Sequence, residues 1–270
     1  MAEPAALPAD LPAGRPAAGG AGGPVVPPGS VAVVTGASRG LGAGLAASFA
    51  AAGLSLGLCA RELPAPVGDA PVVRQSLDVA DAEELERFAD DVVARFGRID
   101  LWVNNAGVLE PTGPLVEARP EELRRHVDTN VLGVLHGTGV FARHVRSRAG
   151  GGVLVNVSSG AATRPYEGWA AYCAAKAAVA MATEVVALEE ARHGLRAYAV
   201  APGVVDTDMQ AAVRATPEDQ FPAVGRFLDA HREGRFNSPS WVARFLLELA
   251  FGDPRPDAVA LRVPEEPVAG

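Results

Sequence analysis

Short apolar segments rich in valine and leucine alternate along the chain with longer segments whose apolar residues recur at helical spacing. The short segments predict seven strands, near residues 31–35, 54–60, 72–77, 100–104, 152–157, 195–200 and 258–263. The longer segments predict helices, near residues 41–52, 81–96, 120–148, 170–193 and 240–251. Several strand segments are apolar at every position, which is typical of strands covered on both faces. The pattern therefore predicts an α/β fold: a single-domain, doubly wound parallel sheet of about seven strands with helices on both faces.

Three segments depart from this alternation. Residues 1–29 contain mainly alanine, proline and glycine, so we expect a disordered tail before a folded domain in residues 30–270. Residues 204–238 contain short helical pieces interrupted by proline and glycine, and we interpret them as a mobile substrate lid. Residues 61–71 join the second and third predicted strands through three prolines and leave no room for the usual crossover helix.

Charge and composition exclude several classes of function. The formal net charge is -8 and there is no basic cluster, which argues against a nucleic-acid partner. No apolar run reaches the ~18 residues of a membrane span, and no secretory signal precedes the domain, so we expect a cytoplasmic protein without a membrane partner. Cys59 and Cys173 lie in apolar segments and predict buried free thiols. The five histidines and two cysteines lack metal-ligand spacing, so no metal site is expected.

A glycine-rich segment directly follows the first predicted strand. Residues 35–42 read TGASRGLG and lead into an alanine-rich helix. Glycine allows the backbone to approach a pyrophosphate, and the N–H groups at the start of the helix face the phosphate. We therefore expect a dinucleotide site, with an ordinary tight turn as the alternative.

The end of the second predicted strand indicates which dinucleotide binds. An acidic residue there would accept hydrogen bonds from the ribose 2′-hydroxyl of NAD. The chain instead has Ala60 followed by Arg61, and Arg39 lies in the glycine-rich segment. Two guanidinium groups suit a 2′-phosphate, so we predict NADPH/NADP+ as the cofactor. The neighbouring Glu62 keeps NADH as the alternative.

Tyr172 and Lys176 stand four residues apart in a predicted helix, so their side chains share one face. Lys176 is the only lysine beside 23 arginines, and the chain has only three tyrosines. A nearby ammonium lowers the pKa of a phenol from about 10 towards the range where proton transfer is efficient. We therefore predict that Tyr172 donates a proton and that Lys176 tunes it, with a surface pair as the alternative.

Two serines follow the predicted strand 152–157, and ligands bind beyond the carboxyl ends of such strands. Ser158 on its own is expected to cap a helix or turn. Ser159 is singled out because it lies thirteen residues before Tyr172.

Together these features resemble the short-chain dehydrogenase/reductase family over residues 30–265, which implies a Rossmann-like fold. The matching motifs are TGASRGLG (35–42), Asp78, NNAG (104–107), Asn130, Ser159, YCAAK (172–176) and PGVVDT (202–207). The resemblance implies a catalytic set of Asn130, Ser159, Tyr172 and Lys176. In that scheme Ser159 and Tyr172 bind the carbonyl oxygen of a small-molecule substrate, nicotinamide delivers hydride, and Tyr172 supplies the proton.

The resemblance also implies roles in cofactor binding. Lys176 would hold the ribose hydroxyls, Asn130 a water on the proton relay, Asp78 the adenine and Thr207 the carboxamide. The implied cofactor-binding residues, besides Tyr172 and Lys176, are Gly36, Ser38, Arg39, Gly40, Leu41, Gly42, Arg61, Asp78, Val79, Asn105, Ala106, Gly107, Pro202, Gly203, Val205 and Thr207.

Residues 153–210 are similar in more detail to sepiapterin reductases and benzil-type diketone reductases. Sepiapterin reductases anchor the pterin with an aspartate on the last strand, where this chain has Leu261, with Asp257 and Glu265 several residues away. We therefore expect a ketone or vicinal dicarbonyl substrate, with sepiapterin as the alternative. The expected substrate-binding residues are Ser159, Tyr166, Trp169 and Met209, with Phe221 as a further candidate and packing of the lid as the alternative role of the aromatic residues.

Two further points follow from the resemblance. A non-catalytic nucleotide-binding scaffold is the alternative function, although every catalytic position holds the expected residue. Relatives form two-fold interfaces at the helices that correspond to residues 120–148 and 170–193, so a homodimer or homotetramer is expected.

Overall fold

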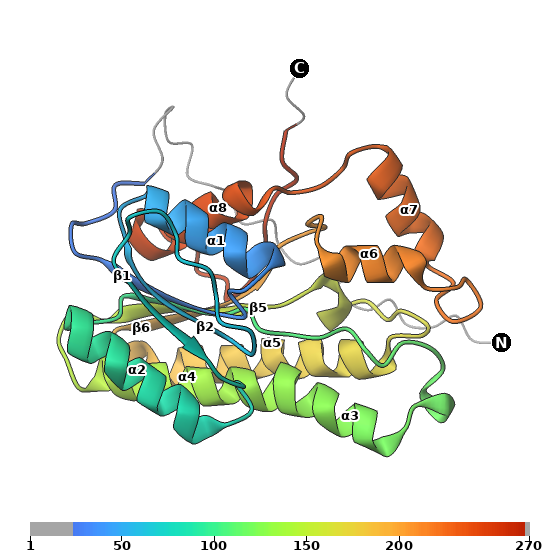
Figure 1. Cartoon of the computed structure of the whole chain (residues 1–270), viewed down its shortest axis with the longest axis horizontal. Coiled ribbons are helices and arrows are strands. Elements are labelled where there is room, and N and C mark those ends of the chain that lie inside the picture. The colour runs from blue at the N-terminus through green and yellow to red at the C-terminus, as the bar shows by residue number, and fades with distance from the viewer. Residues whose placement is uncertain (1–23, 268–270) are drawn as a thin grey trace.

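Seven parallel strands form one sheet in the structure, a computed structural model that describes residues 24–267 (Figure 1). The strands are β1 (Val31–Thr35), β2 (Ser55–Ala60), β3 (Val72–Ser76), β4 (Leu101–Asn104), β5 (Gly152–Val157), β6 (Leu195–Ala201) and β7 (Ala260–Arg262). Their order is β3-β2-β1-β4-β5-β6-β7, so the winding reverses between β1 and β4. Open α/β sheets bind ligands beyond the carboxyl ends of the strands at such a reversal. The predicted doubly wound sheet is confirmed.

Helices cover both faces of this sheet (Figure 1). One face carries α1 (Gly40–Ala51) and α8 (Pro239–Phe251), which pack against each other. The other face carries α2 (Ala82–Phe96), α4 (Gly133–Arg146) and α5 (Ala170–Glu190). Beyond the sheet lie α3 (Pro120–Val127), α6 (Asp208–Ala215) and α7 (Val224–Arg232). Short 3-10 turns occur at η1 (Leu115–Glu117), η3 (Gly160–Ala162) and η4 (Ala191–His193).

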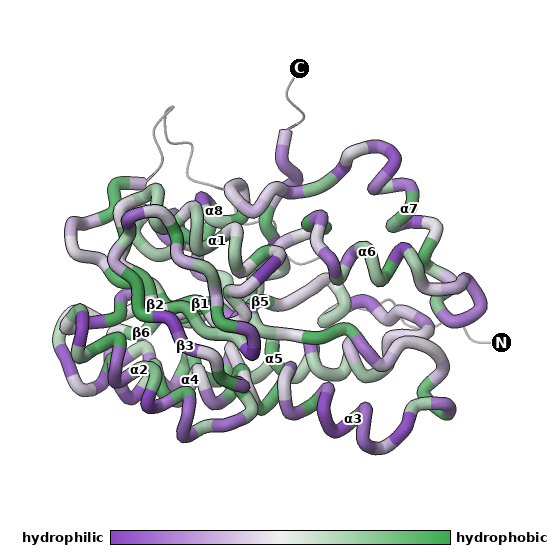
Figure 2. The backbone as a smooth tube through the Cα atoms, in the orientation of Figure 1, coloured by the Kyte–Doolittle hydropathy of each residue, from purple (hydrophilic) through white to green (hydrophobic). Residues whose placement is uncertain are grey.

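Apolar side chains fill the layers between sheet and helices, and Figure 2 shows the strands at the centre as the most hydrophobic part of the backbone. Phe49, Leu56 and Leu246 belong to the layer beneath α1 and α8. Phe88 and Phe141 are fully buried in the opposite layer. Each such side chain contributes roughly 2–3 kcal/mol by leaving water. These two layers make the sheet a firm platform for the groups at its carboxyl edge.

A buried chain of amide groups runs beneath that edge. Asn104 at the end of β4 accepts a hydrogen bond from Trp102 Nε1 at 2.7 Å and donates one to Asn156 Oδ1 of β5 at 2.9 Å. Asn156 in turn donates to Thr183 Oγ1 of α5 at 2.9 Å. Helix α4 approaches so closely that a Cβ at Gly137 would lie 2.1 Å from Asn104 Oδ1. The network fixes the ends of β4 and β5 against α5, which carries Tyr172.

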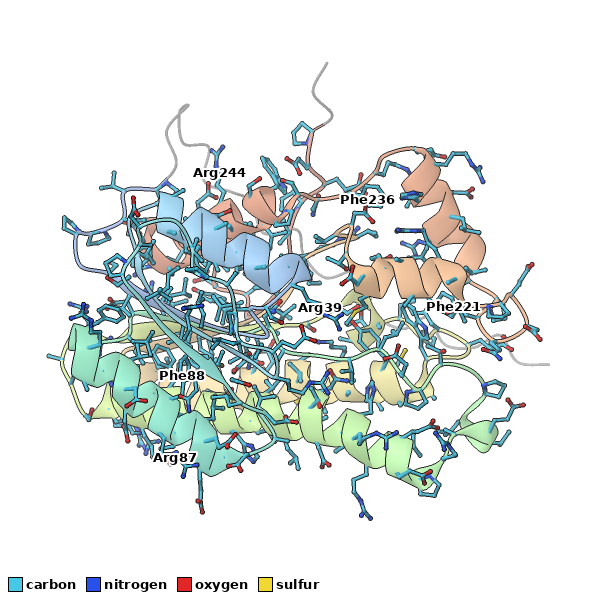
Figure 3. All side chains as sticks on the ribbon, in the orientation of Figure 1. Arg39, Arg87, Phe88, Phe221, Phe236 and Arg244 are labelled. Carbon is cyan, nitrogen blue, oxygen red and sulfur yellow. The ribbon has the colours of Figure 1, made fainter. Side chains whose placement is uncertain are left out.

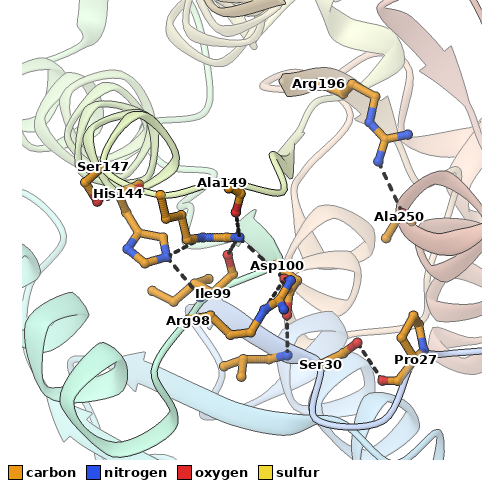
Figure 4. A network of polar contacts seen from close by, with 12 residues as sticks. Pro27, Ser30, Arg98, Ile99, Asp100, His144, Ser147, Ala149, Arg196 and Ala250 are labelled. Atoms are coloured by element: carbon orange, nitrogen blue, oxygen red, sulfur yellow. Dashed lines mark hydrogen bonds and ion pairs between the residues drawn. The ribbon is translucent and has the colours of Figure 1, made fainter. Parts of the chain in front are cut away.

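A second polar network joins the opposite end of the sheet to α4 (Figure 4). The carboxylate of Asp100, just before β4, accepts from the Val31 N–H at 3.0 Å and forms ion pairs with Arg98 and Arg148. His144 Nε2 accepts from the Ile99 N–H and from Arg148 Nε, each at 3.0 Å. Both donors require an unprotonated Nε2, so the network holds the imidazole neutral. Burial accordingly lowers the pKa of His144.

Some elements differ from the sequence predictions in detail. The segment 120–148 is not one regular helix, because a π-helical turn, η2 (Asp128–Leu132), separates α3 from α4. The last strand is shorter than predicted, with three residues in β7. Cys59 is buried as expected, whereas the Cys173 thiol is only half-buried, so that expectation was wrong for Cys173. Residues 61–71 contain no helix between β2 and β3, as predicted.

The structure also bears on the predicted tail, residues 1–29, and on the predicted lid, residues 204–238. Residues 1–23 of the predicted tail lie outside the described residues. Val26, which the sequence assigns to the tail, packs against the core beneath α1. The predicted lid, residues 204–238, contains α6 and α7.

Within residues 24–267, one helix is long and apolar enough to span a membrane, at residues 170–193. Lys176 on this helix is buried against the end of β5, so this helix is packed against the sheet within the domain.

Candidate active site

A cleft of about 700 Å³ lies beyond the carboxyl ends of the strands. It runs from the glycine-rich turn after β1, past the ends of β4 and β5, to the inner faces of α6 and α7. Except for the further candidate Phe221, every residue that the sequence analysis assigned to catalysis, cofactor or substrate lines this one cleft. The fold therefore brings together groups that lie up to 173 residues apart in the chain, from Gly36 to Met209.

The glycine-rich turn is built for close backbone approach. Gly36 and Gly40 adopt left-handed conformations, with φ of 66° and 55°. A Cβ at Gly42 would lie 2.3 Å from the Gly36 carbonyl oxygen, so a larger residue would force the turn open. Helix α1 begins after Arg39 without a side-chain cap or an acidic residue in its first turn. The free N–H groups at this helix end fit a pyrophosphate.

The next turn along the cleft supports the glycine-rich turn. Thr35 Oγ1 accepts hydrogen bonds from the backbone N–H groups of Asn105 and Ala106, at 3.0 and 3.1 Å. Asn105 Nδ2 donates back to the carbonyl oxygens of Thr35 and Gly36, at 2.9 and 3.2 Å. These reciprocal bonds explain why a threonine ends β1 and an asparagine follows β4.

The part of the cleft beyond β2 and β3, which we call the adenosine end, contains both cations and carboxylates. Arg39, Arg61, Glu62 and Asp78 all line it. The Asp78 carboxylate accepts from the Ala80 N–H at 3.0 Å, which fixes its orientation. Arg39 lies between the start of α1 and the start of α6, where it forms an exposed ion pair with Asp208 at 3.4 Å (Figure 3). The guanidinium of Arg39 therefore bridges the cofactor end and the predicted lid.

Tyr172 and Lys176 share one face of α5, as their spacing predicts, and both side chains line the cleft. Lys176 is 6 % exposed, and its Nζ donates to the Val157 carbonyl oxygen at 2.7 Å. The same Nζ lies 5.6 Å from the centre of the Tyr172 ring. Ser159, at the end of β5, caps the η3 turn by accepting from the Ala161 N–H at 3.2 Å. The cap that the sequence predicted at Ser158 is therefore formed by Ser159, the residue at the predicted catalytic position.

Burial controls the acidity of both groups. Desolvation raises the pKa of Tyr172 to about 12, although a hydrogen bond with Ser159 acts in the opposite direction. Desolvation also lowers the pKa of Lys176 to about 8. The expectation that Lys176 brings the Tyr172 pKa below its ordinary value was wrong for this structure, because burial of the phenol raises that pKa. A raised pKa keeps Tyr172 protonated near neutral pH, which is the form that a proton donor needs.

Asn130 occupies the π-helical turn between α3 and α4 and is 1 % exposed. Its amide pairs with both backbone groups of Val108: Nδ2 donates to the Val108 carbonyl at 2.8 Å, and Oδ1 accepts from the Val108 N–H at 3.0 Å. A Cβ at Gly107 would lie 2.9 Å from Asn130 Oδ1, so glycine is needed for this approach. The fully buried His126 contacts the same amide; sequence reasoning missed it, although its i, i+4 spacing from Asn130 was a signal.

The substrate end of the cleft is lined by Tyr166, Trp169, Met209 and Phe227. Phe221 is fully buried and stacks on Trp169 with ring centres 4.3 Å apart and planes at 10°. Phe221 therefore packs behind Trp169 and does not line the cleft. Phe227, which the sequence analysis did not name, lines the cleft instead. We call Tyr166, Trp169, Phe221 and Phe227 the aromatic cluster.

The last strand presents different groups to the cleft from those expected. Leu261 is 1 % exposed and packs in the core beneath α8, so its side chain does not reach the cleft. Arg262 and Glu265 do line the cleft. Glu265 is therefore nearer to the ligand space than its position in the sequence indicated.

The loop after β6 is held in place by a hydrogen bond from Asn237. Asn237 Nδ2 donates to the Pro202 carbonyl oxygen at 2.9 Å, and a Cβ at Gly203 would lie 2.8 Å from the same nitrogen. Thr207 Oγ1 accepts from the Gln210 N–H at 3.4 Å and so caps α6. The predicted carboxamide-binding residue is thus also the residue that begins the lid.

Comparison with known proteins agrees with this geometry. The family model described as short chain dehydrogenase matches residues 30–218. The chain is 34 % identical over 196 residues to benzil reductase ((S)-benzoin forming) of Bacillus cereus, covering 70 % of this chain and 79 % of the relative. It is 32 % identical over 224 residues to the enzyme of the same name from Bacillus subtilis, covering 80 % and 91 %.

Solved structures share the fold. The 3-ketoacyl-(acyl-carrier-protein) reductase of Brucella melitensis, solved as a complex with NADH, is 28 % identical, with a TM-score of 0.74 over 87 % of this chain and 97 % of the other. The cleft, its residues and these similarities lead to one conclusion: the chain belongs to the short-chain dehydrogenase family and is an oxidoreductase that uses a nicotinamide cofactor to interconvert carbonyl and hydroxyl groups.

Proposed function

We propose that this protein is an NADPH-dependent carbonyl reductase that acts on a ketone or a vicinal diketone. One observation carries the proposal: Tyr172, Lys176 and Ser159 line the same cleft as an open helix N-terminus after a glycine-rich turn. A non-catalytic scaffold would have no need for a buried lysine beside a buried tyrosine, since burying each of these groups is unfavourable.

Ser159, Tyr172 and Lys176 have separate roles in the proposed reduction. When bound, the reduced nicotinamide supplies hydride to the carbonyl carbon. The Ser159 hydroxyl donates a hydrogen bond to the carbonyl oxygen, and Tyr172 transfers its proton to that oxygen. The phenolate left on Tyr172 is stabilised by the Lys176 ammonium, whose Nζ lies 5.6 Å from the ring centre.

The preference for NADPH rests on the cations at the adenosine end. Arg39 and Arg61 can pair with a 2′-phosphate, whereas Glu62 would repel it. The Brucella reductase was solved with NADH, which keeps NADH as the alternative cofactor. We expect Arg61→Ala to raise the KM for NADPH about tenfold and to leave the KM for NADH nearly unchanged. A wild-type preference for NADH would overturn this part of the proposal.

The preference for an aromatic dicarbonyl rests on the aromatic cluster and on the benzil reductases among the relatives. Sepiapterin remains the second candidate, because Glu265 lines the cleft and is an acidic group available to a pterin. The two are separated by turnover with benzil, other diketones and sepiapterin, followed as loss of reduced-cofactor absorbance. Turnover of none of these carbonyl compounds, despite tight NADPH binding, would favour the scaffold.

We further propose that the protein is a cytoplasmic homo-oligomer that pairs through α4 and α5. Large apolar side chains are exposed on these helices, including Leu135, Met181, Val185 and Leu188, with Leu188 at 83 % exposure. Exposed apolar groups on two helices that pack side by side are typical of a protein interface. We expect Leu188→Glu to reduce the mass in multi-angle light scattering to that of a smaller species. Leu63→Glu, on the loop after β2, is the matched control; an unchanged mass for Leu188→Glu would contradict the interface.

A further inference from the structure

His126 is a buried titratable group that the reduction scheme does not use. It lies on α3, one helical turn before Asn130, and is fully buried. Its Nδ1 is 2.7 Å from the Glu110 carbonyl oxygen, and Asn130 Nδ2 lies 3.0 Å from its Nε2 and 3.2 Å from its Nδ1. The ring also meets the Tyr172 ring edge-on, with centres 6.2 Å apart. His126 thus touches two residues of the catalytic set.

The contacts fix which nitrogen carries the proton. A carbonyl oxygen at 2.7 Å accepts, so Nδ1 must carry a hydrogen. Asn130 Nδ2 can only donate, and it lies 3.0 Å from Nε2 and 3.2 Å from Nδ1. Since Nδ1 carries the hydrogen, Nε2 is the ring nitrogen that accepts from Asn130 and must be bare. Both conditions hold only for the neutral Nδ1–H imidazole.

The Asn130 amide cannot turn over to relieve a second proton on the ring. Its Nδ2 also donates to the Val108 carbonyl, and its Oδ1 accepts from the Val108 N–H. A flipped Asn130 amide would place Oδ1 against the Val108 carbonyl oxygen and Nδ2 against the Val108 N–H, so both hydrogen bonds would be lost. A charged ring has no bare nitrogen, so a charged His126 loses its bond from Asn130. The Ala171 backbone carbonyl, which also interacts with the ring, favours that charged form.

We propose that His126 is a positioning residue that holds Asn130 against the cofactor loop only while its imidazole is neutral, so that the reductase loses activity in acid as His126 becomes charged. The inference rests on the proposed function, because turnover is its main readout. Val108 directly follows Asn105–Gly107, so the bond from His126 through Asn130 reaches the loop that lines the cofactor end.

The surroundings of His126 favour the neutral ring. Burial lowers its pKa most, and the Lys176 ammonium on α5 acts in the same direction. The carbonyl groups of Glu110 and Ala171 and the Glu110 carboxylate act in the opposite direction. The Tyr172 phenol is uncharged near neutral pH because its pKa is raised. The net shift is downwards, so loss of activity is expected below the ordinary histidine pKa of about 6.5.

Two variants separate the contacts of the ring. His126→Gln places a non-titrating oxygen near the position of Nε2, where it can accept from Asn130. His126→Asn keeps a donor near Nδ1 for the Glu110 carbonyl but does not reach Asn130. We expect His126→Gln to retain turnover near neutral pH and to lose the acid decline of kcat. We expect His126→Asn to lose about ten- to a hundredfold in kcat at every pH, the size of effect that misplacement of an active-site group causes.

Turnover of benzil with NADPH between about pH 5 and pH 8 gives the profile, and melting temperature and NADPH affinity show that each variant is folded. His193→Gln, at an exposed histidine on η4, should keep the wild-type profile. An unchanged acid decline in His126→Gln, or equal turnover of the Gln and Asn variants, would overturn the inference.

A second readout does not depend on turnover. In NMR of nitrogen-labelled protein, the ring signals absent from His126→Gln should report the neutral Nδ1–H form at pH 7. A charged ring or an Nε2–H form at pH 7 would also overturn the inference. Absence of turnover in the wild type, with the Nδ1–H form present, would instead refute the proposed function.

Discussion

The ammonium of Lys176, in the first half of α5, lies against the end of β5, where it donates to the Val157 carbonyl at 2.7 Å. A compact group with three donors fits this space, whereas a planar guanidinium is larger and forks its donors. The use of arginine at every other cationic position in the chain fits this requirement. The i, i+4 spacing from Tyr172 was readable from the sequence, but the acidities were not. They depend on how deeply the folded chain buries each group.

At this scale we predict that Lys176→Arg lowers kcat/KM about a hundredfold or more, although the formal charge is kept. The guanidinium cannot keep both the Val157 contact and the approach to Tyr172. NADPH affinity should fall as well, because the same ammonium is expected to hold the ribose. Arg192→Lys, at an exposed site on η4, is the control and should have no effect. Wild-type kinetics in Lys176→Arg would show that the site needs only a positive charge.

At the scale of elements, the turn between β1 and α1 shows how local rules and tertiary contacts combine. Its glycines were recognisable from the sequence because such turns approach phosphates. The break in the segment 120–148 was not, since the π-helical turn is stabilised by hydrogen bonds between Asn130 and Val108, which only the folded chain brings together. The position of Phe221 behind Trp169 was also hidden, because it depends on how the lid folds back onto η3 and α5.

We predict that Gly42→Ala weakens NADPH binding at least tenfold, because its Cβ would lie 2.3 Å from the Gly36 carbonyl oxygen and displace the turn. Gly225→Ala in α7 is a matched control: nothing lies within 4 Å of the added Cβ, so affinity should be unchanged. Titration of each variant with NADPH, followed by fluorescence, gives both affinities. Equal affinities would mean that the turn can relax around a methyl group.

At the scale of the whole molecule, the sheet separates two polar regions. The carboxyl edge carries the cleft, and the amino edge carries the Asp100 network that ties β1, β4 and α4 together. The sequence predicted the strand number, the parallel arrangement and the edge at which the site forms. It gave no sign of the Asp100 network, because the partners lie 48 and 69 residues away along the chain and share no recognisable motif.

This arrangement predicts that the folded state loses stability in acid. The pKa values of His126 and His144 are both lowered by burial, so both rings are neutral in the folded protein and bind protons more readily when it unfolds. Stability is therefore full above about pH 6.5 and falls as the pH drops below that value. We expect the melting temperature of the wild type to fall by several degrees between about pH 7 and pH 5. In His144→Gln this fall should be smaller, and an equal fall in both proteins would exclude His144 as a cause.

The most direct test of the account is turnover of benzil with NADPH by the wild type and by Tyr172→Phe. The variant keeps the ring that meets Trp169 and His126 but has no proton to give. We predict turnover by the wild type, a loss of at least about a hundredfold in kcat for Tyr172→Phe, and the same NADPH affinity for both. Undiminished turnover by Tyr172→Phe would contradict the central claim that this phenol is the proton donor.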